Sequence, residues 1–138
     1  MPLPPTRELP LSAPAPGSVS IVVARAVRQT DPQAEPCGAA NCLSWFLGEF
    51  DDARTVSGAA LPAAFNARIK MGSPFISRYT LAMIVERLPD GTQRVRATRG
   101  FHWQTHLACF ERADTATLGL QPDDRGLIES NGQLCVRE

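Results

Sequence analysis

The chain has 138 residues, of which 43% are hydrophobic, and its 14 basic residues balance its 14 acidic residues. This length and composition are typical of one folded domain with a single core. The balanced charge lacks the basic excess that draws a protein to nucleic acid or to an anionic membrane, so we expect no nucleic-acid partner. No segment reaches the roughly 18 apolar residues of a membrane-spanning helix, so no membrane span is expected.

The first 18 residues differ from the rest of the chain in their proline content. Prolines stand at positions 2, 4, 5, 10, 14 and 16. Because proline fixes φ and removes an N–H donor, residues 1–18 are predicted to form an extended, mobile leader before a single domain at 19–138. This leader has no basic region followed by an apolar run, so we expect no secretory signal peptide. A cytoplasmic location with reduced cysteines follows, with non-classical export left open.

The domain is predicted to begin with a strand and two helices. Residues 19–27 are rich in β-branched side chains and indicate a strand. Residues 38–50 carry large apolar side chains at helical spacing and indicate the first helix. Those side chains are Leu43, Phe46, Leu47 and Phe50. A second helix is expected at 57–71, with Ser57 as its N-cap and Gly72-Ser73-Pro74 at its end.

From residue 79 onwards the sequence predicts strands joined by turns. The predicted strands are residues 79–88, 94–98, 106–112, 116–120, 127–130 and 133–136. The clearest turn signals are Pro89-Asp90-Gly91-Thr92 and Asn131-Gly132, and the second is typical of a type I′ hairpin. Helices that precede an antiparallel sheet make an α+β fold, in which N-terminal helices pack on a C-terminal antiparallel sheet.

A cysteine stands at the start of the first predicted helix. Cys37-Gly38 follows a polar loop and precedes the apolar run. The helix dipole favours an anion at this end, which stabilises a reactive thiolate. Backbone N–H groups there can bind an oxyanion, and the side-chain amide of Gln29 or Gln33 can supply a second donor. Cys37 is therefore a candidate nucleophile for an amide or thioester carbonyl.

A cysteine nucleophile needs a histidine as its general base. The chain has two histidines, and His106 begins the strand predicted at 106–112. If this strand pairs with the next one as a hairpin, Asp123 or Asp124 lies beside His106 and orients its ring. The two aspartates remain alternatives for this role.

The same residues resemble the nucleophile segment of the double-glycine, bacteriocin-processing peptidases. The matching runs are Gln29-Thr30-Asp31, Cys37-Gly38-Ala39-Ala40 and Cys42-Leu43. In these papain-like enzymes a glutamine precedes Cys-Gly at the start of the central helix, the histidine begins a strand, and the aspartate follows on the next strand. The resemblance implies a papain-like fold and a small cysteine hydrolase. Its site would comprise Cys37 as nucleophile, His106 as base, Asp123 or Asp124 as orienting acid, and Gln29 as oxyanion donor, with Gln33 as the alternative donor.

A zinc site is a second interpretation. Cys37-x4-Cys42 and His106-x2-Cys109 supply four ligands of types that zinc binds. Side chains alternate along a strand, so His106 and Cys109 would point to opposite faces, which weakens this interpretation. We therefore expect no cofactor, with zinc as the alternative.

In the third interpretation the protein catalyses no reaction. A small domain with a proline-rich leader can be an interaction, adaptor or inhibitor domain that binds a protein or peptide. Cys109 and Cys135 stand in predicted apolar strands and are expected in the core. The oligomeric state has no signal in the sequence.

Overall fold

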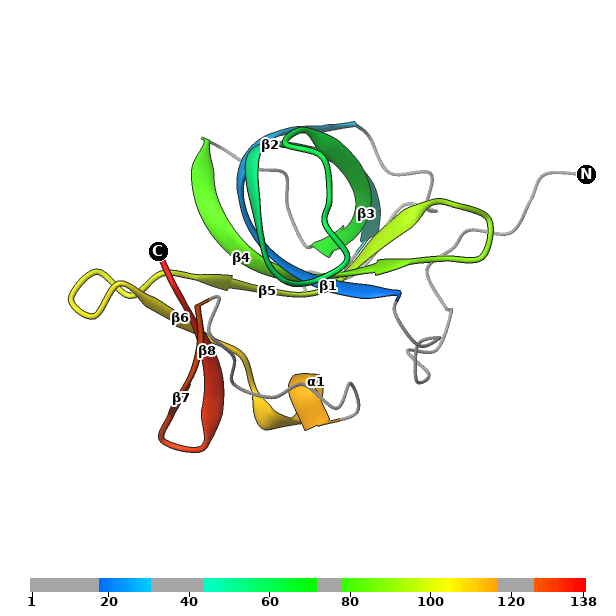
Figure 1. The fold of residues 1–138 in the computed structure, drawn as a ribbon. Coiled ribbons are helices and arrows are strands. Elements are labelled where there is room, and N and C mark those ends of the chain that lie inside the picture. Colours follow the sequence, from blue (N-terminus) through cyan, green and yellow to red (C-terminus); the bar gives the residue numbers. More distant parts are fainter. Residues whose placement is uncertain (1–17, 31–43, 72–77, 117–125) are drawn as a thin grey trace, which may run out of the picture.

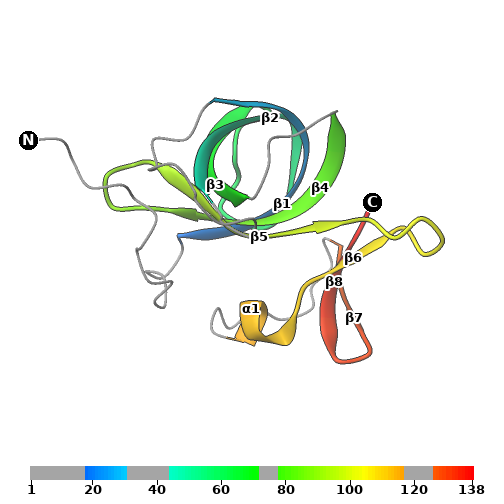
Figure 2. The same ribbon diagram turned by 180° about the vertical axis from the view of Figure 1, so that it is seen from behind.

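The computed structural model describes residues 18–30, 44–71, 78–116 and 126–138. Five strands form a closed barrel in the order β1-β2-β3-β5-β4. They are β1 (Val19–Thr30), β2 (Ser44–Gly58), β3 (Phe65–Met71), β4 (Tyr79–Arg87) and β5 (Gln93–Gly100). A second sheet has the order β6-β8-β7 and accompanies a short helix. These elements are β6 (Leu107–Cys109), α1 (Arg112–Ala116), β7 (Leu127–Ser130) and β8 (Gln133–Arg137). Figure 1 shows the barrel with the second sheet and α1 on one side of it, and Figure 2 shows the same arrangement from behind.

The barrel closes because β1 pairs antiparallel with both β2 and β4. The ladder between β1 and β2 contains three register shifts, which bend these long strands around the barrel. β3 and β5 run parallel and are joined by one register pair, Arg68 with Arg94. The wall therefore has a tightly paired side around β1 and a loosely paired seam between β3 and β5.

Alternate side chains fill the barrel interior. In β3, Phe65, Ala67 and Ile69 are buried inside, while the residues between them face outward. The other strands contribute Val22, Ala24, Ala26, Phe46, Phe50, Leu81, Met83, Val85 and Val95. A Cβ atom at Gly48 would lie 2.9 Å from ring atoms of Phe50. Glycine at this position therefore leaves the space that the Phe50 ring occupies.

A second core lies between the outer wall of the barrel and the three-stranded sheet. The barrel contributes Ile21, Val23, Val56, Ala82 and Ile84, and the rest of the chain contributes Ala108, Phe110, Leu127 and Val136. Much of β1 and β4 is consequently buried on both faces. This explains their nearly continuous apolar sequences, since a strand with one solvent face would alternate apolar and polar residues.

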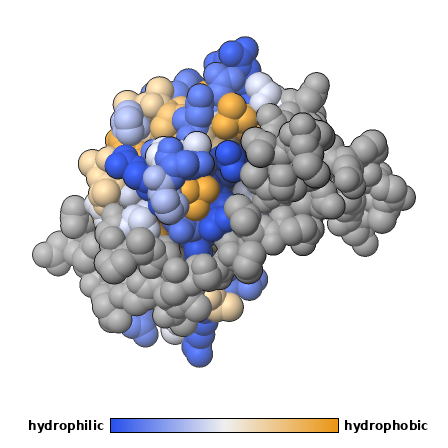
Figure 3. Space-filling view, turned by 90° about the vertical axis from the view of Figure 1, so that its right-hand side faces the viewer, coloured by the Kyte–Doolittle hydropathy of each residue, from blue (hydrophilic) through white to orange (hydrophobic). Residues whose placement is uncertain are grey.

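Away from the two cores the surface is mixed. On the face shown in Figure 3, hydrophobic and hydrophilic residues are interspersed over the described part of the chain. Among the described residues, the exposed large hydrophobic side chains are Leu47 at 43%, Tyr79 at 41% and Trp103 at 77% exposure. Trp103 therefore stands out as the most exposed of them.

The predicted α+β fold is wrong, because the described chain forms a β-barrel with a second β-sheet. The helix predicted at 38–50 is a strand from residue 44 onwards, and its earlier residues lie outside the described part. Phe46 and Phe50 fit helical spacing, but with Gly48 they also form the inward-facing positions of a strand. The pairing of β2 with both β1 and β3 satisfies the N–H and C=O groups of its backbone. It therefore favours the two-residue period of a strand over the 3.6-residue period of a helix.

The helix predicted at 57–71 is wrong for a related reason. Its first residues end β2, and Phe65–Met71 is strand β3. The alternation of Phe65, Ala67 and Ile69 with polar residues is a period of two, although alanine, arginine and lysine favour helices. Here the tertiary pairing with β2 outweighs local helix propensity.

Several predicted elements of the second half are confirmed. Leu127–Ser130 and Gln133–Arg137 pair as a hairpin, with positive φ at both Asn131 and Gly132 as a type I′ turn requires. The turn between β4 and β5 is closed by the bond from Leu88 N to Thr92 O. The strand predicted at 116–120 falls largely outside the described residues, and Ala116 itself ends α1.

Candidate functional site

The sequence-predicted catalytic residues are only partly placed by the structure. Gln29 lies near the end of β1, and His106 directly precedes β6. The remaining predicted residues lie outside the described part of the chain; they are Gln33, Cys37, Cys42, Asp123 and Asp124. The predicted packing of N-terminal helices on a sheet is wrong, while the resemblance to the papain-like peptidases and the roles of these residues stay predictions.

The acid beside His106 is Glu138. Nδ1 of His106 lies 3.0 Å from Oε1 of Glu138, and the backbone N of Glu138 donates to the His106 carbonyl at 3.0 Å. Both side chains are largely exposed. The register of β6 with β8 brings the C-terminal residue to this histidine, and sequence reasoning missed it because it assumed pairing with the next segment of the chain.

Cys109 and Cys135 are joined by a disulfide across β6 and β8. The expectation that they are reduced is therefore wrong, whereas the core position expected for Cys135 is confirmed, because its side chain is fully buried, and Cys109 is half-buried. Cys109 would need to be reduced before it could bind zinc as a thiolate, and Cys37 and Cys42 lie outside the described residues. Among the described residues, no group of three or more His, Cys, Asp or Glu side chains is placed to hold a metal ion.

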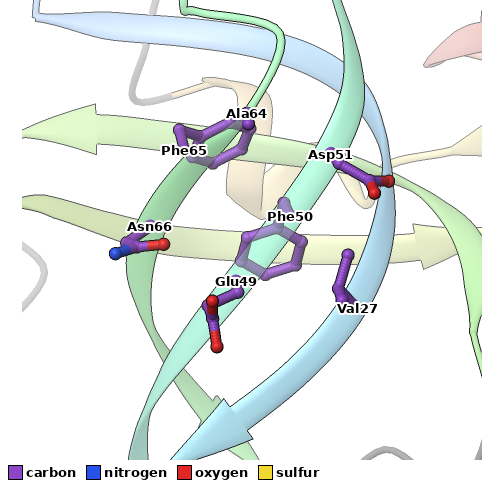
Figure 4. A pocket seen from close by; sticks show the side chains of 7 residues that line it. All are labelled: Val27, Glu49, Phe50, Asp51, Ala64, Phe65 and Asn66. Carbon is purple, nitrogen blue, oxygen red and sulfur yellow. The ribbon is translucent and has the colours of Figure 1, made fainter.

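A pocket of about 360 Å³ opens on the barrel wall where β1, β2 and the start of β3 meet. Figure 4 shows the side chains that line it, which are Val27, Glu49, Phe50, Asp51, Ala64, Phe65 and Asn66. The rings of Phe50 and Phe65 stack with centroids 5.2 Å apart. These residues give the pocket an apolar part, and two carboxylates and an amide give it a polar part.

The two carboxylates of the pocket are held by arginines of β1. Arg25 donates to both oxygens of Asp51, from Nε to Oδ1 and from Nη2 to Oδ2, each at 2.8 Å. This hydrogen bonding lowers the pKa of Asp51 and raises the pKa of Arg25. Arg28 pairs in the same way with Glu49, and this hydrogen bond raises the pKa of Arg28.

This arrangement suits binding better than catalysis. A general base or nucleophile needs an activated group that can reach a substrate. In the pocket, Asp51 and Glu49 already accept bonds from arginines, and the seven lining residues include no histidine and no cysteine. The rings of Phe50 and Phe65 are almost fully buried behind the pocket, and its accessible apolar surface comes from Val27 and Ala64. The pocket therefore offers shape and fixed acceptors, rather than a group prepared to transfer a proton.

A second charged cluster on the barrel is structural. Glu86 accepts from Arg94 Nη2 at 3.0 Å and from Arg96 Nη1 at 2.8 Å, and all three side chains are buried. Removing one partner of such a buried pair leaves an uncompensated charge, so the cluster holds β4 to β5. It lies on the wall apart from the pocket-lining residues.

Comparison of the chain with protein-family models, with curated proteins and with solved structures gave no match. In the described part of the chain, no helix is long and apolar enough to cross a membrane.

Proposed function

We propose that this chain is a non-catalytic binding module that recognises a protein or peptide partner at the pocket between β1, β2 and β3. The observation that carries the proposal is the composition of the pocket. Stacked rings of Phe50 and Phe65 adjoin carboxylates whose geometry is fixed by Arg25 and Arg28. Such a site can hold a side chain by burial and hydrogen bonding without reacting with it.

The size of the pocket supports a side chain as its ligand. Pockets for small molecules span about 300–1,000 Å³ and bury most of the ligand. This pocket, at about 360 Å³, is at the small end of that range and is open to solvent. It therefore accommodates one side chain of a larger partner, whose remaining residues would lie on the neighbouring surface.

The surface beside the pocket offers further contacts. Leu47 is 43% exposed and lies on the outer face of β2, two residues before Glu49. Its register partner is Arg68, and the exposed Lys70 follows on the same face of β3. An apolar side chain between polar and cationic neighbours is typical of a protein-recognition surface.

The architecture of the barrel suggests by analogy where a ligand binds, but not which ligand it is. OB-folds are also five-stranded barrels, and they bind oligonucleotides and oligosaccharides on the face of strands 2 and 3. In this chain the pocket at that face is lined by Glu49 and Asp51. None of the seven lining residues is basic, whereas phosphate binding relies on lysine and arginine, so a peptide is favoured over a nucleic acid.

The proposal is tested by selecting peptides from a displayed random library on the full chain. Ala64 lines the pocket and is exposed, so Ala64→Arg should obstruct the pocket without disturbing the core. Ala63→Arg, next to it and outside the lining set, is the matched control. We expect enriched peptides with a common large side chain that bind the wild type and Ala63→Arg but not Ala64→Arg.

Two results would contradict this proposal. One is that no peptide is enriched, and the other is that the enriched peptides bind both variants equally. Mass spectrometry of the peptides after incubation separates binding from hydrolysis. Intact peptides are expected, and cleavage would favour the hydrolase hypothesis instead.

A further inference from the structure

The disulfide between Cys109 and Cys135 joins two parts of the chain that are otherwise held together by short strands. β6 follows β5 of the barrel through residues 101–106, whereas β7 and β8 pair as a C-terminal hairpin. The ladder between β6 and this hairpin contains three register pairs, and Cys109 with Cys135 is one of them. The bond is therefore a covalent tie between the C-terminal hairpin and a strand that continues directly from the barrel.

Beyond its ladder with β6, the C-terminal hairpin is held by surface hydrogen bonds and by apolar packing. Arg54 Nη2 donates to Arg137 O at 3.0 Å, and Arg112 Nε donates to Gly132 O at 3.0 Å, both in exposed positions. Such bonds add only modestly to stability, because water can replace them. The packing comes from Leu127 and Val136, which are buried in the second core.

The C-terminal hairpin covers an apolar wall of the barrel. This wall consists of Ile21, Val23, Val56, Ala82 and Ile84. A Cβ atom at Gly126 would lie 3.5 Å from Cγ1 of Val56, so the start of β7 lies directly on the wall. Figures 1 and 2 show the second sheet on this side of the barrel. Departure of the hairpin would expose these side chains to water, and an exposed apolar surface of this kind is typical of a binding site.

We propose that the Cys109–Cys135 bond is a redox latch, and that its reduction by a dithiol releases the C-terminal hairpin and uncovers the apolar wall. An isolated two-stranded hairpin is marginally stable in water, so after reduction this hairpin has little structure of its own to retain. The two cysteines are 26 residues apart. Loss of a cross-link over a loop of that size shifts the equilibrium from closed to open by about 300-fold.

The exchange reaction begins at Cys109, which is half-buried, whereas Cys135 is fully buried. Both sulfurs lie on the face of the sheet opposite the apolar wall, because side chains alternate and the neighbouring Ala108 and Val136 face that wall. A thiolate of the reductant attacks Sγ of Cys109, the S–S bond breaks, and Cys135 leaves as a thiolate. The second thiol of the reductant then displaces Cys109. The protons of the two reductant thiols pass to the two cysteines, and the reductant becomes a disulfide.

The barrel does not depend on the C-terminal hairpin. The core inside the barrel contains no residue of the second sheet. β1 stays paired with β2 and β4, and the pocket is lined by residues of the barrel strands and of the segment before β3. The latch therefore controls one surface of the barrel without altering the pocket, and this inference is independent of the proposed function. The wall is expected to be covered in an oxidising compartment and open in a reducing one.

The test compares the oxidised and the reduced full chain by hydrogen exchange and by the fluorescence of a dye that binds apolar surfaces. On addition of excess dithiothreitol, amides of β7 and β8 should exchange about 300-fold faster and dye fluorescence should rise severalfold. Amides of β1 to β4 should stay protected, and reoxidation should reverse both changes. The control variant Cys109→Ala/Cys135→Ala should bind the dye without dithiothreitol and should not respond to it.

A second variant, Cys37→Ser/Cys42→Ser, leaves the latch as the bond on which dithiothreitol acts, and it should respond as the wild type does. Three results would overturn the inference. If reduction changes neither exchange nor dye binding, the bond is a structural cross-link and not a latch. If the barrel amides lose protection together with those of the hairpin, the chain unfolds as a whole. If alkylation and mass spectrometry show that Cys109 and Cys135 stay oxidised in the folded chain, the reductant cannot reach the bond.

Discussion

The barrel and the three-stranded sheet are both built from antiparallel strands, but they are stabilised differently. The barrel joins its first and fourth strands, encloses its own apolar core and has long strands of seven to 15 residues. The sheet has strands of three to five residues and two edges, and the disulfide between Cys109 and Cys135 joins two of its strands. Its apolar side chains are buried only because the outer wall of β1 and β4 covers them.

The comparison teaches that closure makes a small β-structure self-sufficient. The closed barrel pairs most of the backbone of its strands, although β3 and β5 share a single register pair, whereas two or three short strands are marginal in water. The sheet therefore depends on the barrel for its core, while the barrel interior needs nothing from the sheet. The loop that carries Trp103 belongs to the dependent region, and the pocket belongs to the self-sufficient one.

The largest effect on stability is expected from substitutions that remove a large side chain from one of the two cores. Phe50→Ala empties part of the barrel interior and Phe110→Ala empties part of the second core, and both side chains are almost fully buried. Each should lower the free energy of unfolding by about 3–5 kcal/mol if all structure is lost together. Hydrogen exchange should show faster exchange throughout for Phe50→Ala, but chiefly in β6, β7 and β8 for Phe110→Ala. Equal loss of protection in the barrel strands for both would show that the two regions unfold as one unit.

An intermediate effect is expected from the disulfide. Cys109 and Cys135 are 26 residues apart, and cross-linking a loop of that size stabilises by about 3.5 kcal/mol in the chain-entropy account. The double variant Cys109→Ala/Cys135→Ala should expose the amides of β6 and β8 to exchange and leave the barrel amides protected. Addition of a reductant to wild-type protein should reproduce the result, and no change in either region would contradict the dependence of the sheet on this bond.

The smallest effect concerns the ion pair at the pocket. Since Arg25 lowers the pKa of Asp51 in the folded state, the unfolded chain takes up this proton more readily. The Arg25–Asp51 pair therefore stabilises the fold at pH values above the carboxyl pKa of the unfolded chain, about 3.9. This contribution is lost as the pH falls through the lower pKa of the folded state. Urea unfolding at several acidic pH values should show a shallower pH dependence for Asp51→Asn than for wild type.

The matched control for this prediction is Asp52→Asn. Its carboxylate lies 3.7 Å from Arg25 Nη2 and is 76% exposed, so the contact is weaker than the two-point contact of Asp51. The control should keep the pH dependence of the wild type. A variant Asp51→Asn with an unchanged pH profile would show that the Arg25 pair does not contribute to stability.

Local signals predicted the second half of the chain better than the first. Asn131-Gly132 specifies its turn through the positive φ that both residues adopt, and this needs no distant partner. Residues 44–58 and 65–71 have no such signal. Their apolar residues fit more than one period, and helix-favouring residues in β3 point away from the structure that forms.

The candidate site was harder to predict than the fold. The expectation that His106 stands at the start of a strand agrees with its place directly before β6, and its role as a base stays a prediction. The carboxylate beside it belongs to Glu138, and not to Asp123 or Asp124, which lie outside the described residues. The pocket has no motif, because its residues come from three strands and reach one place through barrel closure. The local signal for the pocket was the alternation of buried and outward-facing residues in 65–70, in which Asn66 faces outward beside the inward-facing Phe65.

The sequence by itself determined the turns and the absence of a charge excess. It also determined that residues 19–27 and 79–88 are strands, because these properties depend on neighbouring residues and on composition. Only the tertiary structure decided that residues 44–58 and 65–71 are strands, that Cys109 meets Cys135, and that Glu49 and Asp51 share a pocket with Phe65. The physical reason is that strands take their backbone partners from distant parts of the chain, so their pairing is a property of the whole barrel.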